Sequence, residues 1–408
     1  MGVIAVVGTL DSKGAEHAFV ADQIRRHGHS VLLIDVGTLD PPTIVPDISR
    51  EQVAAAGQID LSALTAERDR GRCVAAMAES LPVLLMQLLV QRRIDGVISL
   101  GGSSGTAIAS SGMRGLPTGF PRLMVSTMAS GNVAPYLGTQ DILLMPSIVD
   151  VAGLNRVSRG VFSRAAAAIC GMVSLESSDS DDRPVIAASM FGNTTECLGH
   201  AIPLLESAGY EVLVFHATGA GGRTMESLIA SGLVDGVLDI TTTELADELA
   251  GGVLSAGPDR LTAAATAGVP QIVVPGCLDM INFGEPTTIP EKYQDRLFYR
   301  HNPQVTLMRT SAAESVVLGK QLAEKINRSS GPVSVLLPLR GISVIGAEGG
   351  PFHDAAADAA LFTALSQSLR HDVRVIDVDC TINDAQFAQA CVAELLRILG
   401  WSETEDGD

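Results

Sequence analysis

Hydrophobic runs rich in β-branched residues alternate along the chain with stretches whose apolar residues recur at helical spacing. In the first half, the runs predict strands near 3–7, 31–36, 96–100, 122–126 and 142–145, and helices near 13–27, 72–93, 104–113 and 155–175. In the second half, they predict strands near 185–190, 211–215, 234–239, 271–274, 333–337 and 373–377, and a last helix over 384–399. Strands that alternate with helices are typical of parallel βαβ units, so we expect an α/β fold.

The pattern of the first half returns in the second half. In both halves an apolar first run leads into a polar loop. The third run, at 94–100 and again at 234–240, has an Asp-Gly pair between one apolar residue and a longer apolar stretch. This repeat predicts two related Rossmann- or flavodoxin-like lobes, each with a mostly parallel sheet flanked by helices. We place the lobes at 1–176 and 184–402, joined by a polar linker and followed by a frayed acidic tail.

Composition narrows the classes of function. A chain of 408 residues exceeds one ordinary core, which agrees with two domains. The formal net charge of −18 argues against nucleic acid or an anionic membrane surface as partner, because both require a basic patch. The six cysteines include no C-x-x-C pair, so we expect buried reduced thiols. With no basic leader and no apolar stretch long enough to cross a bilayer, we expect a cytoplasmic protein.

A glycine- and serine-rich loop follows the third predicted strand and opens a helix; it consists of Gly101, Gly102, Ser103, Ser104, Gly105 and Thr106. Glycines allow close approach of the backbone, and N–H groups at a helix N-terminus suit a phosphate. The loop matches neither the P-loop nor the dinucleotide fingerprint, and a turn that merely closes a βα unit is equally common. Its position at the carboxyl end of a strand in an open sheet favours ligand binding.

The polar loop after the first run contains Asp11, Ser12 and Lys13. A carboxylate there suits Mg²⁺ or a ribose hydroxyl, and the ammonium group of Lys13 suits phosphate charge. Alternatively, Asp11 or Ser12 caps the following helix, with Glu16 near the capping-box position. We favour ligand binding because this loop and the glycine-rich loop face the same crevice.

Three more segments belong to the same predicted crevice. Ser126 and Thr127 form a small polar loop after the fourth strand. The segment 38–61 has three prolines and no clear periodicity, and a loop of that length in a compact domain is usually functional or covers a site. The charged segment 67–72 offers arginines to a phosphate, although a solvated first turn of a helix explains it equally well.

Polar side chains also follow the strands of the second half. We predict a small-molecule site, with a catalytic role, formed by His216, Arg223, Asp279 and His301. Arg223 would hold an anionic group, a histidine would act as general acid or base, and Asp279 would orient that histidine or hold a metal. The alternative is that these groups bond one another to stabilise the lobe. Together with His353 they match no compact zinc spacing, and no G-x-S-x-G elbow supports a serine nucleophile.

Several motifs in order carry a resemblance to a known family; they occupy 8–13, 101–106, 126–131, 149–155, 216–219, 239–244, 279–284 and 301–310. Together they resemble the family that comprises the ATP-binding N-terminal region of the tomato mosaic virus resistance protein and its uncharacterised bacterial relatives. The resemblance covers nearly the whole chain. It implies a two-lobed α/β protein that binds ATP with Mg²⁺ in its first lobe and pairs as a homodimer.

The positions that match the family's nucleotide site are Asp11, Ser12, Lys13, Thr38, Arg70 and the phosphate loop 102–106. Ser104 departs from the plant protein, which has Gly there, but a serine still offers its backbone N–H. The antiviral role of the plant protein is not carried over. From residues and resemblance together we expect an ATP-dependent or ATP-regulated metabolic enzyme acting on a small anionic metabolite. The alternative is a nucleotide-binding regulator that acts through a protein partner.

Overall fold

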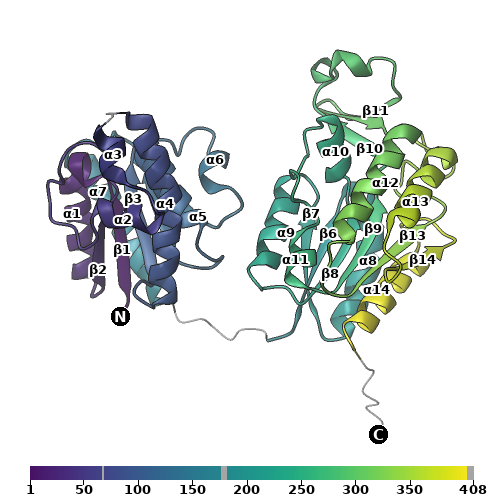
Figure 1. Cartoon of the computed structure of the whole chain (residues 1–408), viewed down its shortest axis with the longest axis horizontal. Helices are drawn as coiled ribbons and strands as arrows, with labels where there is room; N and C mark the ends of the chain where they lie inside the picture. Colours follow the sequence, from purple (N-terminus) through teal and green to yellow (C-terminus); the bar gives the residue numbers. More distant parts are fainter. Residues whose placement is uncertain (67–68, 176–181, 402–408) are drawn as a thin grey trace, which may run out of the picture. The chain divides into compact units, whose positions relative to one another are not determined.

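The computed structural model describes residues 1–66, 69–175 and 182–401, so most of the predicted linker and the tail after 401 lie outside the described residues. Two compact units divide the chain, and we call them lobe one (1–180) and lobe two (181–408). Each lobe has its own sheet and its own cores, and each is described by itself (Figure 1).

Lobe one contains a five-stranded sheet in the order β2-β1-β3-β4-β5, and every neighbouring pair is parallel. The strands are β1 (Val3–Gly8), β2 (Ser30–Asp35), β3 (Gly96–Gly101), β4 (Arg122–Ser126) and β5 (Leu143–Pro146). The helices are α1 (Leu10–Arg26), α2 (Arg50–Ala56), α3 (Leu61–Ala66), α4 (Arg70–Val90), α5 (Ser103–Arg114), α6 (Ala134–Leu137) and α7 (Arg156–Ser174).

Helices cover both faces of this sheet, which explains why its strands read as continuous apolar runs. Alternate residues of β1 enter opposite cores: Ala5 and Val7 pack with residues of α2, α4 and α5, whereas Ile4 and Val6 pack with residues of α1 and α7. The strands and most of the helices therefore lie where the hydrophobic pattern predicts them.

Helix α4 is, within the described ranges, the one helix long and apolar enough to cross a membrane. Its side chains Met77, Leu81 and Leu85 are fully buried in lobe one, and α4 packs against α2, α3 and α5. We conclude that α4 is a core helix of a globular domain, as the sequence predicted for 81–90.

Lobe two contains a six-stranded parallel sheet in the order β14-β13-β9-β8-β6-β7. Its strands are β6 (Val185–Met190), β7 (Glu211–His216), β8 (Gly236–Thr241), β9 (Gln271–Gly276), β13 (Val333–Pro338) and β14 (Arg374–Val378). The helices are α8 (Thr195–Ser207), α9 (Ala220–Ala230), α10 (Glu244–Ala250), α11 (Ala263–Ala267), α12 (Ala312–Ile326), α13 (Ala355–Ser368) and α14 (Ala385–Ile398), with short 3₁₀ turns η1 (Gly192–Thr194), η2 (Pro286–Thr288) and η3 (Glu291–Tyr293).

The two sheets share one topology. In each lobe the first strand lies between the second and the third, and the fourth and fifth follow on the side of the third. The strand order therefore reverses between β1 and β3 in lobe one and between β6 and β8 in lobe two. Such a switch point is where doubly wound sheets bind ligands, at the carboxyl ends of the strands. The α/β fold with two related Rossmann-like lobes is confirmed.

Lobe two differs from lobe one by an insertion between β9 and β13. A three-stranded antiparallel sheet, β10-β12-β11, is built from β10 (Met280–Phe283), β11 (Phe298–Asn302) and β12 (Val305–Arg309), and it lies at the upper end of lobe two in Figure 1. Asp279 lies in the turn directly after β9, as predicted, whereas the prediction that His301 follows a strand of the parallel sheet is wrong, because His301 lies within β11. The turn from β9 to β10 passes through Cys277, which has a φ of 57°. Gly and Asn are the residues that usually adopt a positive φ, so a cysteine at this position gives no signal for the turn.

Candidate ligand-binding site

A cavity of about 300 Å³ lies at the carboxyl edge of the lobe-one sheet, over β2, β1 and β3. This is the switch point of the sheet, and we call it the first cavity. Most of the predicted nucleotide-site residues line it, namely Asp11, Ser12, Lys13, Thr38, Arg70, Gly102, Ser103, Ser104 and Gly105. Sequence reasoning missed six further lining residues, which are Thr9, Leu39, Asp40, Val74, Ile108 and Asp150.

The N-terminus of α5 opens into the first cavity. Gly102 is its N-cap residue and has no capping side chain, and its carbonyl accepts the N–H of Thr106 at 2.8 Å. Within the described part of the chain, the N–H groups of 103–105 have no acceptor. Helix N-termini carry partial positive charge and leave such donors for an anion. The glycine-rich loop thus has the local structure that binds a phosphate.

Two cationic side chains also line the first cavity. Lys13 lies at a kink in α1, where its φ of −128° departs from helical values, and Arg70 is the first residue of α4. Neither forms an ion pair or a side-chain hydrogen bond with any residue that the structure describes. In a chain with an excess of acidic residues, two cations left without acceptors beside free N–H groups indicate an anionic ligand.

The wall of the first cavity is held by two carboxylates. Oδ2 of Asp11 accepts the N–H groups of Thr38 and Leu39 at 3.1 and 3.2 Å, which fixes the start of the loop after β2. Asp35 at the end of β2 is buried and accepts the guanidinium of Arg50 at 2.7 Å. Asp11 therefore positions the loop instead of capping α1, and the role of Asp35 was missed because a strand-end Asp gives no distinctive signal.

Four of the predicted nucleotide-site residues lie behind the first cavity. A Cβ on Gly101 would lie 3.1 Å from Cα of Gly105, so this glycine lets α5 start close against β3. The hydroxyls of Thr106 and Ser126 are buried and lie 2.6 Å apart, which ties α5 to the end of β4. Thr127 donates its N–H to the carbonyl of Gly101. These residues shape the loops, and Ser126 and Thr127 line a different cavity.

The residues described here include no group of three or more His, Cys, Asp or Glu arranged to hold a metal ion. A Mg²⁺ bound with a nucleotide needs less, because it takes one or two carboxylates, substrate phosphates and water. The carboxylates of Asp11, Asp40 and Asp150 all line the first cavity. The donor set therefore fits Mg²⁺ delivered with a phosphate ligand and does not form a metal cage of its own.

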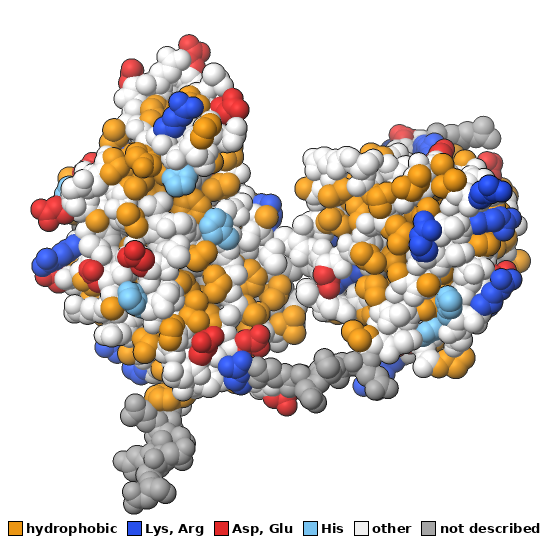
Figure 2. All heavy atoms as spheres, turned by 180° about the vertical axis from the view of Figure 1, so that it is seen from behind, with side chains coloured by type: hydrophobic (Ala, Val, Ile, Leu, Met, Phe, Trp, Pro, Cys, Tyr) orange, Lys and Arg blue, Asp and Glu red, His pale blue; other side chains and the backbone are white. Residues whose placement is uncertain are grey.

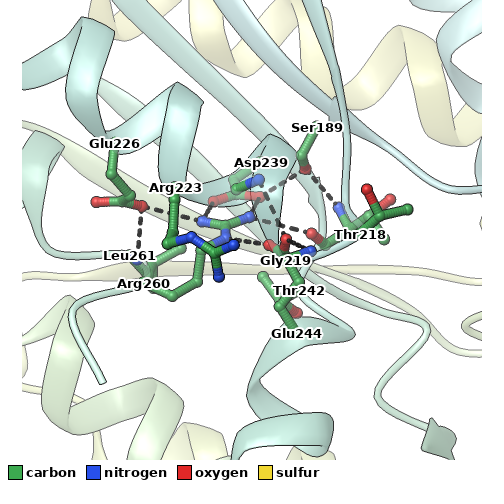
Figure 3. A network of polar contacts seen from close by, with 12 residues as sticks. Ser189, Thr218, Gly219, Arg223, Glu226, Asp239, Thr242, Glu244, Arg260 and Leu261 are labelled. Carbon is green, nitrogen blue, oxygen red and sulfur yellow. Dashed lines mark hydrogen bonds and ion pairs between the residues drawn. The ribbon is translucent and has the colours of Figure 1, made fainter. Parts of the chain in front are cut away.

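Lobe two fills the corresponding edge with its own side chains (Figure 3). Arg260 is buried, and its guanidinium makes two hydrogen bonds to the carboxylate of Asp239, at 2.6 and 2.7 Å. It also bonds Glu244 at 2.6 Å and Glu226 at 3.2 Å. Burial lowers the pKa of Arg260, but the three carboxylates outweigh burial and raise that pKa well above its ordinary value.

Glu244 occupies the helix N-terminus in this cluster. Its Oε1 accepts the N–H groups of Gly219 and Gly222, at 2.6 and 3.1 Å, where α9 begins. A Cβ on Gly222 would lie 2.1 Å from this carboxylate, so the glycine admits it. The glycine-rich turn 219–222, next to Arg223, for which the sequence predicted an anionic partner, therefore binds a carboxylate of the protein itself.

The structure gives the four predicted lobe-two site residues separate surroundings. His216 is exposed at the end of the edge strand β7, with its ring against Phe191 at a centroid distance of 5.4 Å. Arg223 donates to the carbonyl of Ser255 at 2.9 Å. His301 is exposed in β11 of the antiparallel sheet. No hydrogen bond, ion pair or ring contact between described residues joins any two of the four.

Asp279 is the fourth of these residues and is fully buried after β9. Its Oδ2 accepts the hydroxyl of Ser343 at 2.5 Å, while its Oδ1 has no partner among the residues in view. Burial raises the pKa of Asp279 to about 6, although the charge of Arg309 and the hydroxyl of Ser343 lower it. Asp279 is thus an interior carboxyl group under the loop after β13.

Sequence reasoning missed Arg260 entirely. Its partners Asp239, Glu226 and Glu244 lie 16 to 34 residues away along the chain, and no spacing rule connects them. The available signal was a single Arg in a Gly-Pro-Asp-Arg loop of an acidic protein, next to several acids at strand and helix ends. A buried acid requires a cation or a proton. Acids at strand and helix ends therefore predict that a cation lies nearby, but they do not predict which residue supplies it.

Comparison with known proteins identifies the chain's relatives. The N-terminal domain of the uncharacterised protein family UPF0261 matches residues 2–178, and the C-terminal domain of that family matches residues 183–399. A UPF0261 protein of Clostridium tetani is 45% identical over 398 residues, which cover 97% of this chain and 98% of that protein. A UPF0261 protein of Rhizobium meliloti is 47% identical over 392 residues, which cover 96% of this chain and 97% of that protein.

The resemblance to the plant protein is also confirmed. A ToMV resistance protein of Solanum lycopersicum is 39% identical over 417 residues, which cover 96% of this chain and 55% of the tomato protein. The chain therefore spans about half the length of that relative. With both family domains matched in order, the chain belongs to the uncharacterised protein family UPF0261.

Proposed function

We propose that lobe one binds ATP, with Mg²⁺, in the first cavity. One observation carries the proposal: the N–H groups of 103–105 and the cations Lys13 and Arg70, which have no partner among the described residues, surround one cavity at the switch point of the sheet. The phosphates would lie against the N-terminus of α5, where the N–H groups and the helix dipole favour negative charge. Lys13 and Arg70 would neutralise the charge that remains.

The rest of the first cavity suits the other parts of a nucleotide. Leu39, Val74 and Ile108 are the apolar lining residues, and they offer the base a surface that excludes water. Asp40 or Asp150 would accept a hydrogen bond from a ribose hydroxyl or share Mg²⁺ with the phosphates. When bound, Mg²⁺ would polarise the phosphates, while the residues of this chain orient them.

Calorimetric titration with Mg-ATP tests this proposal. We expect Lys13→Ala and Arg70→Ala each to weaken binding about tenfold to a hundredfold, because each removes a charge-assisted hydrogen bond worth roughly 1.5–3 kcal/mol. Arg93→Ala is the matched control, since Arg93 is exposed and does not line the first cavity. Equal affinity in all three variants and the parent protein would refute the assignment.

What the bound ATP does is a second step of the proposal. We propose a cytoplasmic ATP-dependent or ATP-regulated enzyme for a small anionic metabolite, which the exposed His216 and Arg223 of lobe two support. The alternative is a regulator that acts through a protein partner, and the self-filled edge of lobe two supports it. Phosphate release from Mg-ATP, measured with and without candidate metabolites, separates the two: turnover supports the enzyme, and tight binding without turnover supports the regulator.

We also propose a homodimer. Hydrophobic side chains reach the surface of both lobes between polar ones in the face that Figure 2 shows, and Val344 and Leu297 are among the large apolar residues that lie more than half exposed. Two-fold assemblies are the commonest way for a soluble chain to cover such surface. Sedimentation at micromolar concentration tests the proposal, and a species near 42 kDa would refute it.

A further inference from the structure

A second cavity, of about 480 Å³, lies at the same carboxyl edge of lobe one. It lies over β4 and β5, beside the first cavity over β2, β1 and β3. Asp150 lines both cavities. Near the boundary, a Cβ on Gly102 would lie 3.8 Å from the hydroxyl of Thr127. A ligand in the second cavity would therefore be a neighbour of a ligand at the N-terminus of α5.

The second cavity differs from the first in its charge and its hydrogen-bonding groups. Its lining includes Ser126, Thr127, Ser130, Ser147 and Asp150. The hydroxyl of Ser126 already pairs with Thr106 and accepts the N–H of Met128, so the hydroxyls left for a ligand are those of Thr127, Ser130 and Ser147. None of the residues that line it is a Lys, Arg or His, so an anionic ligand would meet a carboxylate with no cation to offset it. Hydroxyl groups both donate and accept hydrogen bonds, and a carboxylate accepts them. The lining thus matches a neutral ligand that carries hydroxyl groups.

A strained turn forms the rim of the second cavity. Ile148 has a φ of 66°, and the N–H of Val149 donates to the carbonyl of Ser147 at 2.8 Å, which closes a three-residue γ-turn with a positive φ. A β-branched residue in this region is a genuine outlier, and such strain concentrates at functional sites. The Ile148 side chain is 73% exposed, while Ser147 is buried. The turn offers an apolar side chain at the rim and a serine on the wall.

We propose that the second cavity binds a neutral polyhydroxylated small molecule, of the sugar or polyol class, beside the nucleotide. The serine and threonine hydroxyls and Asp150 would bond its hydroxyl groups, and Ile148 would cover its C–H face. The proposal rests on the proposed function of the first cavity, because it takes that cavity to hold the whole nucleotide. It assigns Thr127 to this second ligand and not to ATP, and it leaves Ser126 the structural role of joining α5 to β4.

Ligand-observed NMR on the full chain tests the proposal, with D-ribose, ribitol and myo-inositol as probes and ribose 5-phosphate as the anionic counterpart. We expect saturable binding of at least one neutral probe and, with inorganic tripolyphosphate saturating the first cavity, weaker binding of the phosphate ester. Ser130→Leu fills the cavity from an exposed position and should weaken the neutral probe at least tenfold. Ser147→Leu is the second variant should the first not fold. Ser30→Leu, exposed at the start of β2, is the control and should bind as the parent does.

Titration of the same variants with ATP and with inorganic tripolyphosphate separates the two proposals. We expect both affinities to be unchanged in Ser130→Leu. A variant that loses affinity for ATP and keeps it for tripolyphosphate would show that the second cavity holds the nucleoside, which overturns the inference. Binding of none of the neutral probes to the parent protein would overturn it as well. Failure of tripolyphosphate to bind the parent would instead refute the proposed function of the first cavity.

Discussion

The two parallel sheets have the same order of their first five strands, but the polar groups at their carboxyl edges are paired in one lobe and left without partners in the other. In lobe one, Lys13, Arg70 and the N–H groups at the N-terminus of α5 line one cavity, and none of these donors has an acceptor among the described residues. In lobe two, Glu244 occupies a helix N-terminus and Arg260 is enclosed by acids (Figure 3). One edge therefore leaves its donors available to an anion from outside, whereas the other edge pairs them with carboxylates of its own. The comparison shows that a conserved scaffold does not imply a repeated ligand.

The largest expected effect is a loss of stability in lobe two when the filled edge loses its buried arginine. Arg260→Ala would leave three acidic side chains without their cation, and breaking a buried ion pair in this way costs about 3–5 kcal/mol of unfolding free energy. Urea denaturation followed by the fluorescence of Trp401, the single tryptophan of the chain, measures the loss in lobe two. Arg340→Ala is the control, because its pair with Asp379 is exposed and should contribute less than about 1 kcal/mol. Similar losses in both variants would contradict the comparison.

A second prediction concerns the carboxylate that fills the edge. Glu244→Ala removes the acceptor of two backbone N–H groups and a partner of Arg260, so we expect a loss of about 3 kcal/mol. Acetate supplies the missing carboxylate, and it should raise the melting temperature of this variant more than chloride does at equal ionic strength. Glu206→Ala, at an exposed position of α8, should show no such difference. Identical responses to the two salts would mean that the vacated turn binds no anion.

A third prediction concerns the open edge and compares two glycines. At Gly105 a Cβ would meet nothing closer than the carbonyl of Leu100 at 3.8 Å, so Gly105→Val should fold normally. Its methyl groups would occupy the first cavity and should weaken ATP binding at least a hundredfold, which corresponds to about 2.7 kcal/mol. Gly101→Val would instead crowd Gly105 and destabilise the fold itself by about 1–3 kcal/mol. Calorimetry and circular dichroism distinguish the two effects, and unchanged ATP affinity in folded Gly105→Val would remove the proposed phosphate site.

The smallest expected effect is a pH dependence of lobe two. Burial raises the pKa of Asp247 to about 7, although Asn282 donates two hydrogen bonds to its carboxylate. The folded state then keeps a proton that the unfolded state releases at lower pH, so stability from this group is present at acidic pH and is lost as pH rises toward 7. Relative to the parent, Asp247→Asn should gain about 2 kcal/mol of unfolding free energy between pH 5 and pH 7.5. A constant difference across that range would contradict the raised pKa.

Much of the fold was predictable because parallel strands covered on both faces give long apolar runs, as in β1 and β3. The first cavity was predictable in part, because glycines and hydroxyl residues after a strand are typical of a ligand loop. The antiparallel insertion was not predicted, since β10 and β12 have only four and five residues, and such short apolar runs do not by themselves distinguish a strand from a loop. The role of Arg260 was not predictable, since its acidic partners are far apart in the sequence and only the fold brings them together. The rule that polar residues after strands form a site was applied wrongly to His301, because His301 lies within strand β11.

Under the proposed function, the filled edge of lobe two leaves lobe one as the lobe whose stability depends on the cell's supply of a small molecule. A ligand that binds the folded state alone stabilises it in proportion to the logarithm of its concentration, by about 2.7 kcal/mol at a hundred times its dissociation constant. Glu244 is covalently part of lobe two, so its contribution there does not vary with concentration. The described residues of lobe one include no such built-in occupant, and its resistance to proteases should rise and fall with the proposed ligand of the first cavity. The amount of intact protein would thereby record how much of that ligand is present.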